Sequence, residues 1–347
     1  MISLHAVARK AARQLSQTTH QASSSRFNHT ASRSSHISTL LLNPELTEED
    51  ASNELRWITQ EVRDTSSKLM AKGKLPPVED DRIQEMVERR STGEPIQYIL
   101  GSTDFGPLTI KCRRPVLIPR PETAYIFEKL SSAILSSIPP LTSSKRPTKP
   151  LDILDLCTGT GCISFLLSRL NPLSKVTGID NSPAAIQLAM MNNQELGMTD
   201  KVTVKFGNLF KDPATLLPLD GSKVGLVVSN PPYIPYDQYQ NLPSSVKHFE
   251  SPSALIGDID KQDGQVKGKG KGLEFYERIS EILPDLLADQ GQLEQVGWKG
   301  IPRTAFEIGI GQSEDVMDIL KSSNVIGRTE VWKDQFGIDR MVVGWNH

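Results

Sequence analysis

One short turn in the chain has the residue types needed to orient a planar amino group. Residues 224–236, VGLVVSNPPYIPY, begin as an apolar run that stops at Asn230, Pro231, Pro232 and Tyr233. Two adjacent prolines remove two backbone donors and fix two φ angles, which suits a rigid, non-helical exit from a strand. The side-chain oxygen of Asn230 and the carbonyl oxygen of Pro231 could accept the two hydrogens of an NH₂ group. Tyr233 could stack on that group, so we predict that these four residues are catalytic.

Such a turn is useful where the acceptor nitrogen is a weak nucleophile. The nitrogen lone pair of an amide is delocalised, and in a peptide bond this resonance supports a rotation barrier of about 18–20 kcal/mol. Acceptors that hold both hydrogens raise the electron density on nitrogen and aim its lone pair. Holding two reactants together can contribute up to about 7–11 kcal/mol. The alternative is a double-proline turn that only ends a strand.

A second candidate site is a glycine-containing turn followed by an acidic residue. The stretch LDLCTGTGC, residues 154–162, predicts a strand, a turn and the start of a helix, and a turn of this kind lets a ligand approach the backbone closely. The predicted cofactor-binding residues in it are Asp155, Cys157, Thr158, Gly159, Thr160 and Gly161. Asp180 ends the next predicted strand, where a carboxylate can accept both hydroxyls of a ribose.

The glycine spacing helps to choose the nucleotide. Three positions after Gly161, where the dinucleotide fingerprint has its third glycine, this chain has Ser164. An adenosine ligand without phosphates is therefore favoured over NAD, and we predict S-adenosylmethionine. Asn208, Leu209 and Phe210 follow the third predicted strand and are expected to enclose the adenine, with Asn230 beside the cofactor's sulfonium. A solvated loop carboxylate is the alternative for Asp180.

The elements that must position these residues alternate between strand and helix. From Leu151 onward, short apolar strands alternate with helical stretches, which predicts a parallel sheet covered on both faces. The end of the chain, RTEVWKDQFGIDRMVVGW, predicts two strands joined by a turn that contains Gly337. A mostly parallel, Rossmann-like sheet closed by an antiparallel pair is the α/β architecture of class I S-adenosylmethionine-dependent methyltransferases.

The rest of the chain is divided by changes in composition. Residues 1–44 contain five basic residues and no acidic one, which is typical of a mitochondrial transit peptide, here expected to be disordered. An ordinary disordered tail is the alternative. Residues 45–93 predict a small helical domain for substrate recognition, residues 94–125 connecting strands and loop, and residues 126–347 the catalytic domain. Residues 258–271, rich in Gly, Lys and Asp, are interpreted as a flexible insertion.

Composition argues against several other classes of protein. The chain has 347 residues and a net charge of −2, and without residues 1–44 it has 34 basic residues against 41 acidic ones. An acidic body argues against direct nucleic-acid binding. No apolar run approaches the roughly 18–20 residues that cross a bilayer, so no membrane association is expected. The three cysteines have no metal-ligand spacing and no even count for disulfides, so no metal site is predicted.

The segments upstream of the catalytic domain carry a family resemblance. GEPIQYILGSTDFGPLTI (93–110) and VLIPRPET (116–123), together with FESPSALIG, GLEFYERI, FEIGIGQ and KDQFGIDRMVV downstream, resemble the peptide chain release factor N(5)-glutamine methyltransferases of the HemK/PrmC type. The resemblance covers about residues 50–345 and implies methylation of the glutamine side chain in the Gly-Gly-Gln loop of a release factor. With the predicted transit peptide, it implies an enzyme of the mitochondrial matrix.

The chain departs from the family pattern in three places. Relatives usually continue PRPET with Glu, where this chain has Ala124, and their Glu-Pro pair is spaced here as Glu250, Ser251, Pro252. Residues 258–271 and 292–303 resemble loop insertions. Two other functions remain open: an N6-adenine-type nucleic-acid methyltransferase, and a non-catalytic cofactor-binding assembly factor. The second would be expected to lose Asn230 or the prolines.

Overall fold

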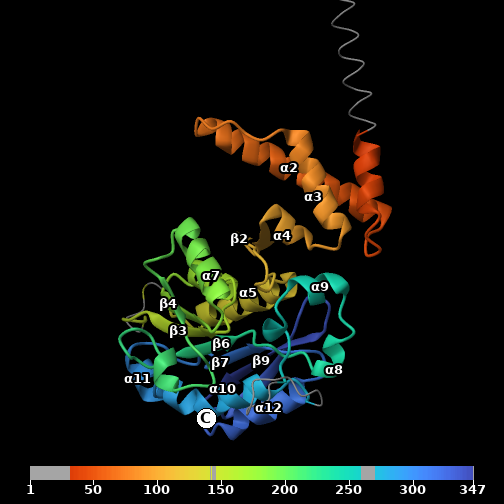
Figure 1. The fold of residues 1–347 in the computed structure, drawn as a ribbon. Coiled ribbons are helices and arrows are strands. Elements are labelled where there is room, and N and C mark those ends of the chain that lie inside the picture. The colour runs from red at the N-terminus through yellow and green to blue at the C-terminus, as the bar shows by residue number, and fades with distance from the viewer. Residues whose placement is uncertain (1–31, 141, 143–145, 259–269, 347) are drawn as a thin grey trace, which may run out of the picture. The chain divides into compact units, whose positions relative to one another are not determined.

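The computed structural model describes residues 32–140, 142, 146–258 and 270–346. The chain divides into two compact units, residues 1–100 and 101–347, which are described separately (Figure 1). Residues 1–31, which hold most of the predicted transit peptide, lie outside the described residues, as do residues 259–269 of the predicted insertion.

The first unit is helical, as the apolar spacing predicted. It contains a helix over residues 32–40, α2 (Glu48–Ala71), α3 (Glu79–Ser91) and α4 (Ile96–Leu100). Helix α2 begins at a capping box, in which the Thr47 side chain accepts from the Asp50 backbone and the Asp50 side chain accepts from the Thr47 backbone. Ile58 on α2 and Val87 on α3 are fully buried in the apolar core that these helices share.

The limits of this unit differ from those expected from composition. Residues 32–40 are helical rather than disordered, and Leu40 is fully buried in the same core as Ile58. A buried apolar side chain ties residues just before 44 to the helical unit, so the disorder expected up to residue 44 does not extend over them. At the other end the unit runs to Leu100 rather than to residue 93, because Ile96 and Ile99 of α4 are also buried in this core.

The second unit is built on the sheet predicted from the alternating strands and helices. Its described strands in spatial order are β5 (Val202–Phe206), β4 (Ser174–Asp180), β3 (Leu151–Leu156), β6 (Leu226–Ser229), β7 (Thr304–Glu307), β9 (Asp339–Trp345) and β8 (Arg328–Lys333). The first five are parallel, and β9 is antiparallel to both β7 and β8. The predicted antiparallel pair at the end of the chain is thus confirmed.

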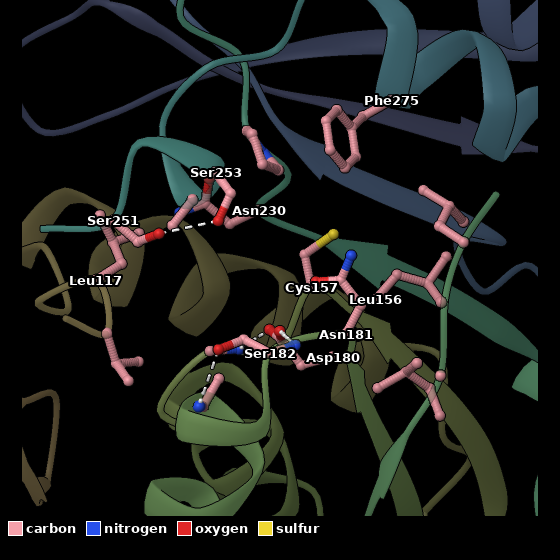
Figure 2. Close-up of a pocket in the computed structure, with 18 of the residues that line it drawn as sticks. Leu117, Leu156, Cys157, Asp180, Asn181, Ser182, Asn230, Ser251, Ser253 and Phe275 are labelled. Atoms are coloured by element: carbon pink, nitrogen blue, oxygen red, sulfur yellow. Dashed lines mark hydrogen bonds between the residues drawn. The ribbon is translucent and has the colours of Figure 1, made fainter. Parts of the chain in front are cut away.

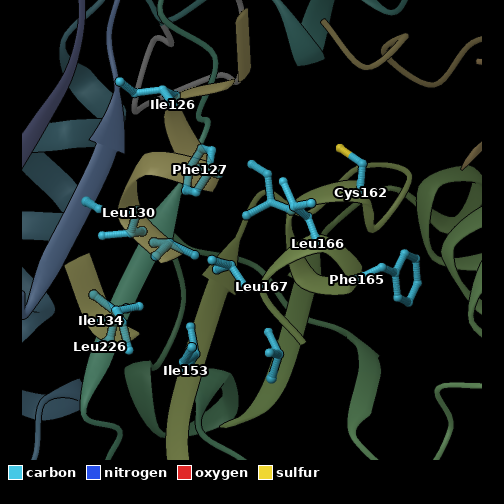
Figure 3. Close-up of a cluster of buried hydrophobic side chains, with 14 of the residues drawn as sticks. Ile126, Phe127, Leu130, Ile134, Ile153, Cys162, Phe165, Leu166, Leu167 and Leu226 are labelled. Carbon is cyan, nitrogen blue, oxygen red and sulfur yellow. The ribbon is translucent and has the colours of Figure 1, made fainter. Parts of the chain in front are cut away.

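Helices cover both faces of this sheet. They include α5 (Pro121–Ser136), α6 (Cys162–Leu170), α7 (Pro183–Leu196), α10 (Glu274–Leu286), α11 (Gln290–Gln295) and α12 (Ser313–Ser322), and a separate hairpin of β1 (Ser102–Phe105) and β2 (Leu108–Lys111) precedes α5. Ile153 belongs to the core with α5 and α6, whereas its neighbour Leu154 belongs to the core with α10 and α12. Successive strand residues point to opposite faces, so the sheet separates two apolar layers, one of which is shown in Figure 3.

One segment that resembled a loop insertion is part of the core. Residues 292–303 include the end of α11, and Leu293, Trp298 and Ile301 are all buried in the layer that contains Ile153. The Trp298 indole also donates to the carbonyl of Lys149, at 3.0 Å. This segment therefore contributes to the core, and its being an insertion relative to the family stays a prediction.

The other segment that resembled an insertion, residues 258–271, is anchored by Asp258. The Asp258 side chain is buried and accepts the backbone N–H groups of Tyr236, at 2.8 Å, and of Gly272, at 2.7 Å. The ends of the segment from 258 to 271 are therefore joined through one carboxylate. No helix of the described residues is long and apolar enough to cross a bilayer.

Candidate cofactor and acceptor site

A pocket opens at the carboxyl ends of β3, β4 and β6, the edge at which parallel α/β sheets bind ligands. Figure 2 shows Asp180, Asn181 and Ser182 at one end, Asn230, Ser251 and Ser253 at the other, and Cys157 between them. The residues predicted from sequence that line this pocket are Cys157, Gly159, Asp180, Leu209, Phe210, Asn230 and Pro232. Asp155, Thr158, Thr160, Gly161, Asn208, Pro231 and Tyr233 are not among the lining residues.

Asp180 is the charged group of the cofactor end. It is the last residue of β4, and its two carboxylate oxygens accept the backbone N–H groups of Gly159, at 2.9 Å, and Ser182, at 2.8 Å. Burial raises the pKa of Asp180, and the same backbone hydrogen bonds oppose that shift. Each carboxylate oxygen has a further lone pair, so the group can still accept ribose hydroxyls.

Asp155 lies behind the glycine turn and is fully buried. One of its carboxylate oxygens accepts the hydroxyls of Thr158 and Ser164, both at 2.6 Å. Burial raises the pKa of Asp155 to about 6, against the lowering effect of these two hydrogen bonds. The structure therefore gives Asp155 and Thr158 a role in holding the turn, and their direct contact with the cofactor stays a prediction.

The turn itself contains an unusual backbone conformation. Cys157 has φ 60°, in the left-handed region that favours glycine, and Gly159 and Gly161 have φ 56° and 82°. A side chain at Gly161 would also meet the ring of Phe165, 2.3 Å from its nearest atom. Gly161 thus serves close packing of the turn on α6, whereas Gly159 and Cys157 border the pocket.

Apolar side chains form the wall next to Asp180. Leu209 and Phe210 come from the segment after β5, and Phe275 from the start of α10, with the two phenyl rings packed edge to face at 5.2 Å. Asn208 is not among the residues that line the pocket, and its side-chain oxygen accepts the backbone N–H of Phe210, at 2.9 Å. This hydrogen bond helps to position Phe210, and the adenine contact of Asn208 stays a prediction.

The Asn-Pro-Pro-Tyr turn, Asn230 to Tyr233, directly follows β6 and forms the other end of the pocket. The side-chain NH₂ of Asn230 lies 3.5 Å from the hydroxyl of Thr123. The backbone carbonyl of Tyr233 accepts the side-chain NH₂ of Gln312, at 2.9 Å, and Gln312 also donates to the carbonyl of Lys271. Burial raises the pKa of the Tyr233 phenol, so this ring is neutral and available for packing.

The pocket wall beyond the turn was not predicted from sequence. Glu250, whose side chain is 1% exposed, accepts the Arg120 guanidinium with both carboxylate oxygens, at 2.7 and 2.9 Å. This ion pair joins the loop before α5 to the loop that carries Ser251 and Ser253. Both partners belong to stretches of family resemblance, but the 130 residues between them give no local signal of their contact.

Ala124, the departure from the family pattern, lies in the apolar layer on α5 and is not among the residues lining the pocket. The insertion-like spacing at Glu250, Ser251 and Pro252 is accommodated by a short 3-10 turn, Pro252–Ala254. Among the described residues, no group of three or more His, Cys, Asp or Glu side chains could hold a metal ion.

The pocket fits an adenosine-containing cofactor. A carboxylate with free lone pairs lies at one end, aromatic and aliphatic side chains form the wall beside it, and backbone at Gly159 leaves open space where a side chain would project. These are the features needed for a ribose, for a flat apolar base and for a close approach to the backbone.

Comparisons with known proteins assign the chain to a family. Residues 147–263 match a family model described as a methyltransferase domain, and residues 41–101 match one described as a PrmC N-terminal domain. A release factor glutamine methyltransferase of Geobacter sulfurreducens is 33% identical over 270 residues, covering 78% of this chain and 80% of that protein. The protein of the same name from Fusobacterium nucleatum is 35% identical over 265 residues, which cover 76% of this chain and 63% of that protein.

Solved structures are more distant. The N-terminal domain of human METTL16 in complex with SAH has a TM-score of 0.44 and 16% identity, and it covers 75% of this chain and 82% of that one. That similarity is too low to support an argument about the site. The sequence similarity to the Geobacter protein, together with the two family matches, is sufficient: the chain belongs to the family of release factor glutamine methyltransferases, which use S-adenosylmethionine.

Proposed function

We propose that this protein methylates the side-chain amide nitrogen of the glutamine in the Gly-Gly-Gln loop of a mitochondrial peptide chain release factor. The observation that carries the proposal is the shared pocket: Asn230 and Pro232, from the turn suited to an NH₂ group, line the same cavity as Asp180, the candidate ribose acceptor. The names of the bacterial relatives support a release factor as the protein substrate.

The residues of the turn orient the substrate amide and do not act as a strong base. When bound, S-adenosylmethionine supplies an electrophilic methyl group. Asn230 accepts one hydrogen of the substrate amide through its side-chain oxygen, and the carbonyl of Pro231 accepts the other. The nitrogen lone pair would thereby be aimed at the methyl group. The carbon–nitrogen bond would form as the methyl–sulfur bond breaks and leaves its electron pair on sulfur, and one amide proton would then leave to water. Positioning of this kind can supply several kcal/mol of the barrier, on the order of 7–11 at most.

The proposed site of action is the mitochondrial matrix. It rests on residues 1–44, which hold Arg9, Lys10, Arg13, Arg26 and Arg33 and no acidic residue. A fusion of these residues to a fluorescent reporter is expected to enter mitochondria. A reporter that stays in the cytosol would contradict the proposed mitochondrial location but not the proposed reaction.

The reaction is tested by transfer of a tritiated methyl group to purified release factors, followed by peptide mapping. The label is expected in the peptide that contains Gly-Gly-Gln. A factor in which that glutamine is replaced by glutamate lacks the NH₂ group and should take no label. Label that persists in the glutamate factor, or label that appears only on added nucleic acid, would contradict the proposed substrate.

A further inference from the structure

The carboxyl edge of the sheet brings a buried carboxyl group next to the catalytic turn. Strands β6 and β7 are parallel neighbours with Ser229 paired to Phe306, so the next residues on each strand are Asn230 and Glu307. Glu307 is 2% exposed, and one of its carboxyl oxygens has no hydrogen-bond partner among the described residues. Neither the ribose contact nor the amide contact proposed above uses this group.

Thr123 connects the two residues. It is 2% exposed at the start of α5, its hydroxyl lies 3.5 Å from the side-chain NH₂ of Asn230, and the same hydroxyl faces Glu307 and lowers the pKa of that carboxyl group. A hydroxyl has one hydrogen to donate. If that hydrogen goes to the Glu307 carboxylate, the oxygen of Thr123 can only accept, and the group of Asn230 that faces it must be the NH₂.

We propose that Thr123 and Glu307 are positioning residues that orient the Asn230 side chain, so that its oxygen faces the pocket as an acceptor for the substrate amide. The inference rests on the proposed function, because only an NH₂-bearing substrate needs an acceptor there. The two ends of an asparagine amide have almost the same shape, so packing alone does not distinguish them. A directional hydrogen-bond chain does distinguish them.

The direction of the chain depends on the ionisation of Glu307. Burial raises the pKa of Glu307 to about 7. The charged and titratable groups that face this carboxyl are Arg340 from β9, Arg120 and Glu122 from the start of α5, and Tyr233 from the turn, while the Tyr276 hydroxyl of α10 donates to the Glu307 backbone carbonyl. A protonated Glu307 can donate to Thr123, which then donates to Asn230. This favours the orientation in which the Asn230 oxygen faces Thr123 and its NH₂ faces the pocket.

The orientation can be measured without any methyl transfer. We suggest the full chain labelled with ¹⁵N in asparagine, with the Asn230 NH₂ signal assigned by its loss in Asn230→Asp and followed between pH 5.5 and 8.5. Its chemical shift is expected to change with pH, with a midpoint near pH 7. In Glu307→Gln and Thr123→Val the chemical shift should not depend on pH. Asn193, whose NH₂ donates to the carbonyl of Val202 at 2.8 Å, serves as an internal control that should not move.

Turnover provides the second measurement. The wild-type kcat is expected to rise with pH through about 7, because the ionised carboxyl holds the productive orientation. Thr123→Val should lower kcat at least about tenfold at pH 8 and leave the cofactor Kd within about twofold, whereas Thr123→Ser, which keeps the hydroxyl, should retain at least about a third of kcat. Glu307→Gln should have a low kcat at every pH, and its kcat should not rise with pH through about 7.

The outcomes separate the two proposals. An Asn230 signal that ignores pH in the wild type, or a folded Thr123→Val with wild-type kcat, overturns the orientation role. A kcat that still rises with pH through about 7 in Glu307→Gln also overturns the orientation role. A wild-type enzyme that labels no release factor overturns the proposed function instead, and the NMR titration then still decides whether Thr123 and Glu307 control Asn230.

Discussion

The two ends of the pocket are held in place in different ways. At the cofactor end, Asp180 is held by backbone N–H groups of Gly159 and Ser182, which belong to the turns directly after β3 and β4. At the acceptor end, Asn230 and Tyr233 are held by side chains of Thr123 and Gln312, 107 and 79 residues away. The cofactor end is therefore set by local chain geometry, and the acceptor end depends on distant parts of the fold meeting correctly.

The largest effect is expected from Asn230→Ala. Loss of the side-chain acceptor should reduce turnover on a release factor by well over tenfold, and a loss of about 10²-fold would match the removal of one preorganised polar group at an active site. Cofactor affinity and melting temperature should change little, because the side chain belongs to the acceptor end. Steady-state kinetics beside calorimetry would show the separation, and equal losses in kcat and cofactor affinity would show that the two ends are not independent.

Asp180→Ala should show the opposite pattern, a loss of cofactor affinity with little loss of kcat. Removing a charge-assisted acceptor costs roughly 1.5–3 kcal/mol, which is about a 10–150-fold weaker cofactor Kd. With saturating cofactor, kcat should recover most of its value. Asp180→Asn keeps one side-chain acceptor for the backbone of the turn and should lose less affinity. Calorimetry that finds unchanged binding in Asp180→Ala would mean that the ribose lies elsewhere.

Gln312→Ala tests whether a side chain distant in sequence helps to hold the Asn-Pro-Pro-Tyr turn. The substitution leaves the partly buried carbonyl of Tyr233 without its donor, at a cost to the free energy of unfolding of about 1–3 kcal/mol. We expect turnover to fall several-fold, since the turn loses one anchor, while cofactor affinity stays near wild type. Denaturant titration and kinetics check both parts, and a variant that loses stability but keeps full turnover would show that the prolines alone hold the turn.

The smallest effect is a change in the pH dependence of stability. The pKa of Asp155 is raised by burial from 3.8 to about 6, so the folded protein binds more protons than the unfolded chain between these values. Stability from this group is therefore present at low pH and declines as pH rises through about 6. Urea titrations from pH 4 to 7 should show a steeper decline in wild type than in Asp155→Asn, and parallel curves would indicate an ordinary carboxyl.

The sequence predicted the class of the fold because the relevant signals are local. Alternating apolar strands and helices indicated the parallel sheet, and the turn at Gly337 indicated the closing antiparallel pair. Each of these features depends on residues that are close together in the chain.

Other parts of the site could not be predicted because their contacts are distant in sequence. The pairing of Arg120 with Glu250, and the contact of Thr123 with Asn230, arise only when the sheet has brought the chain segments together. The comparison with the family pattern indicated a loop insertion at residues 292–303 and gave no sign that Trp298 is buried, with 1% of it exposed. The hydrogen bonds that one carboxylate oxygen of Asp155 and the side-chain oxygen of Asn208 accept from the protein were also not predicted.

The carboxylate of Asp258 makes one region of the chain suitable for engineering. Because it accepts the backbone N–H of Gly272 as well as that of Tyr236, it fixes residues 258 and 272, the two points between which residues 259–271 run. A chain that leaves and returns at fixed points can be lengthened at a cost of only about 0.6 kcal/mol for each doubling of its length. A peptide tag or a small reporter domain spliced between residues 262 and 266 should therefore leave the enzyme folded and provide a handle for isolating it together with its substrate.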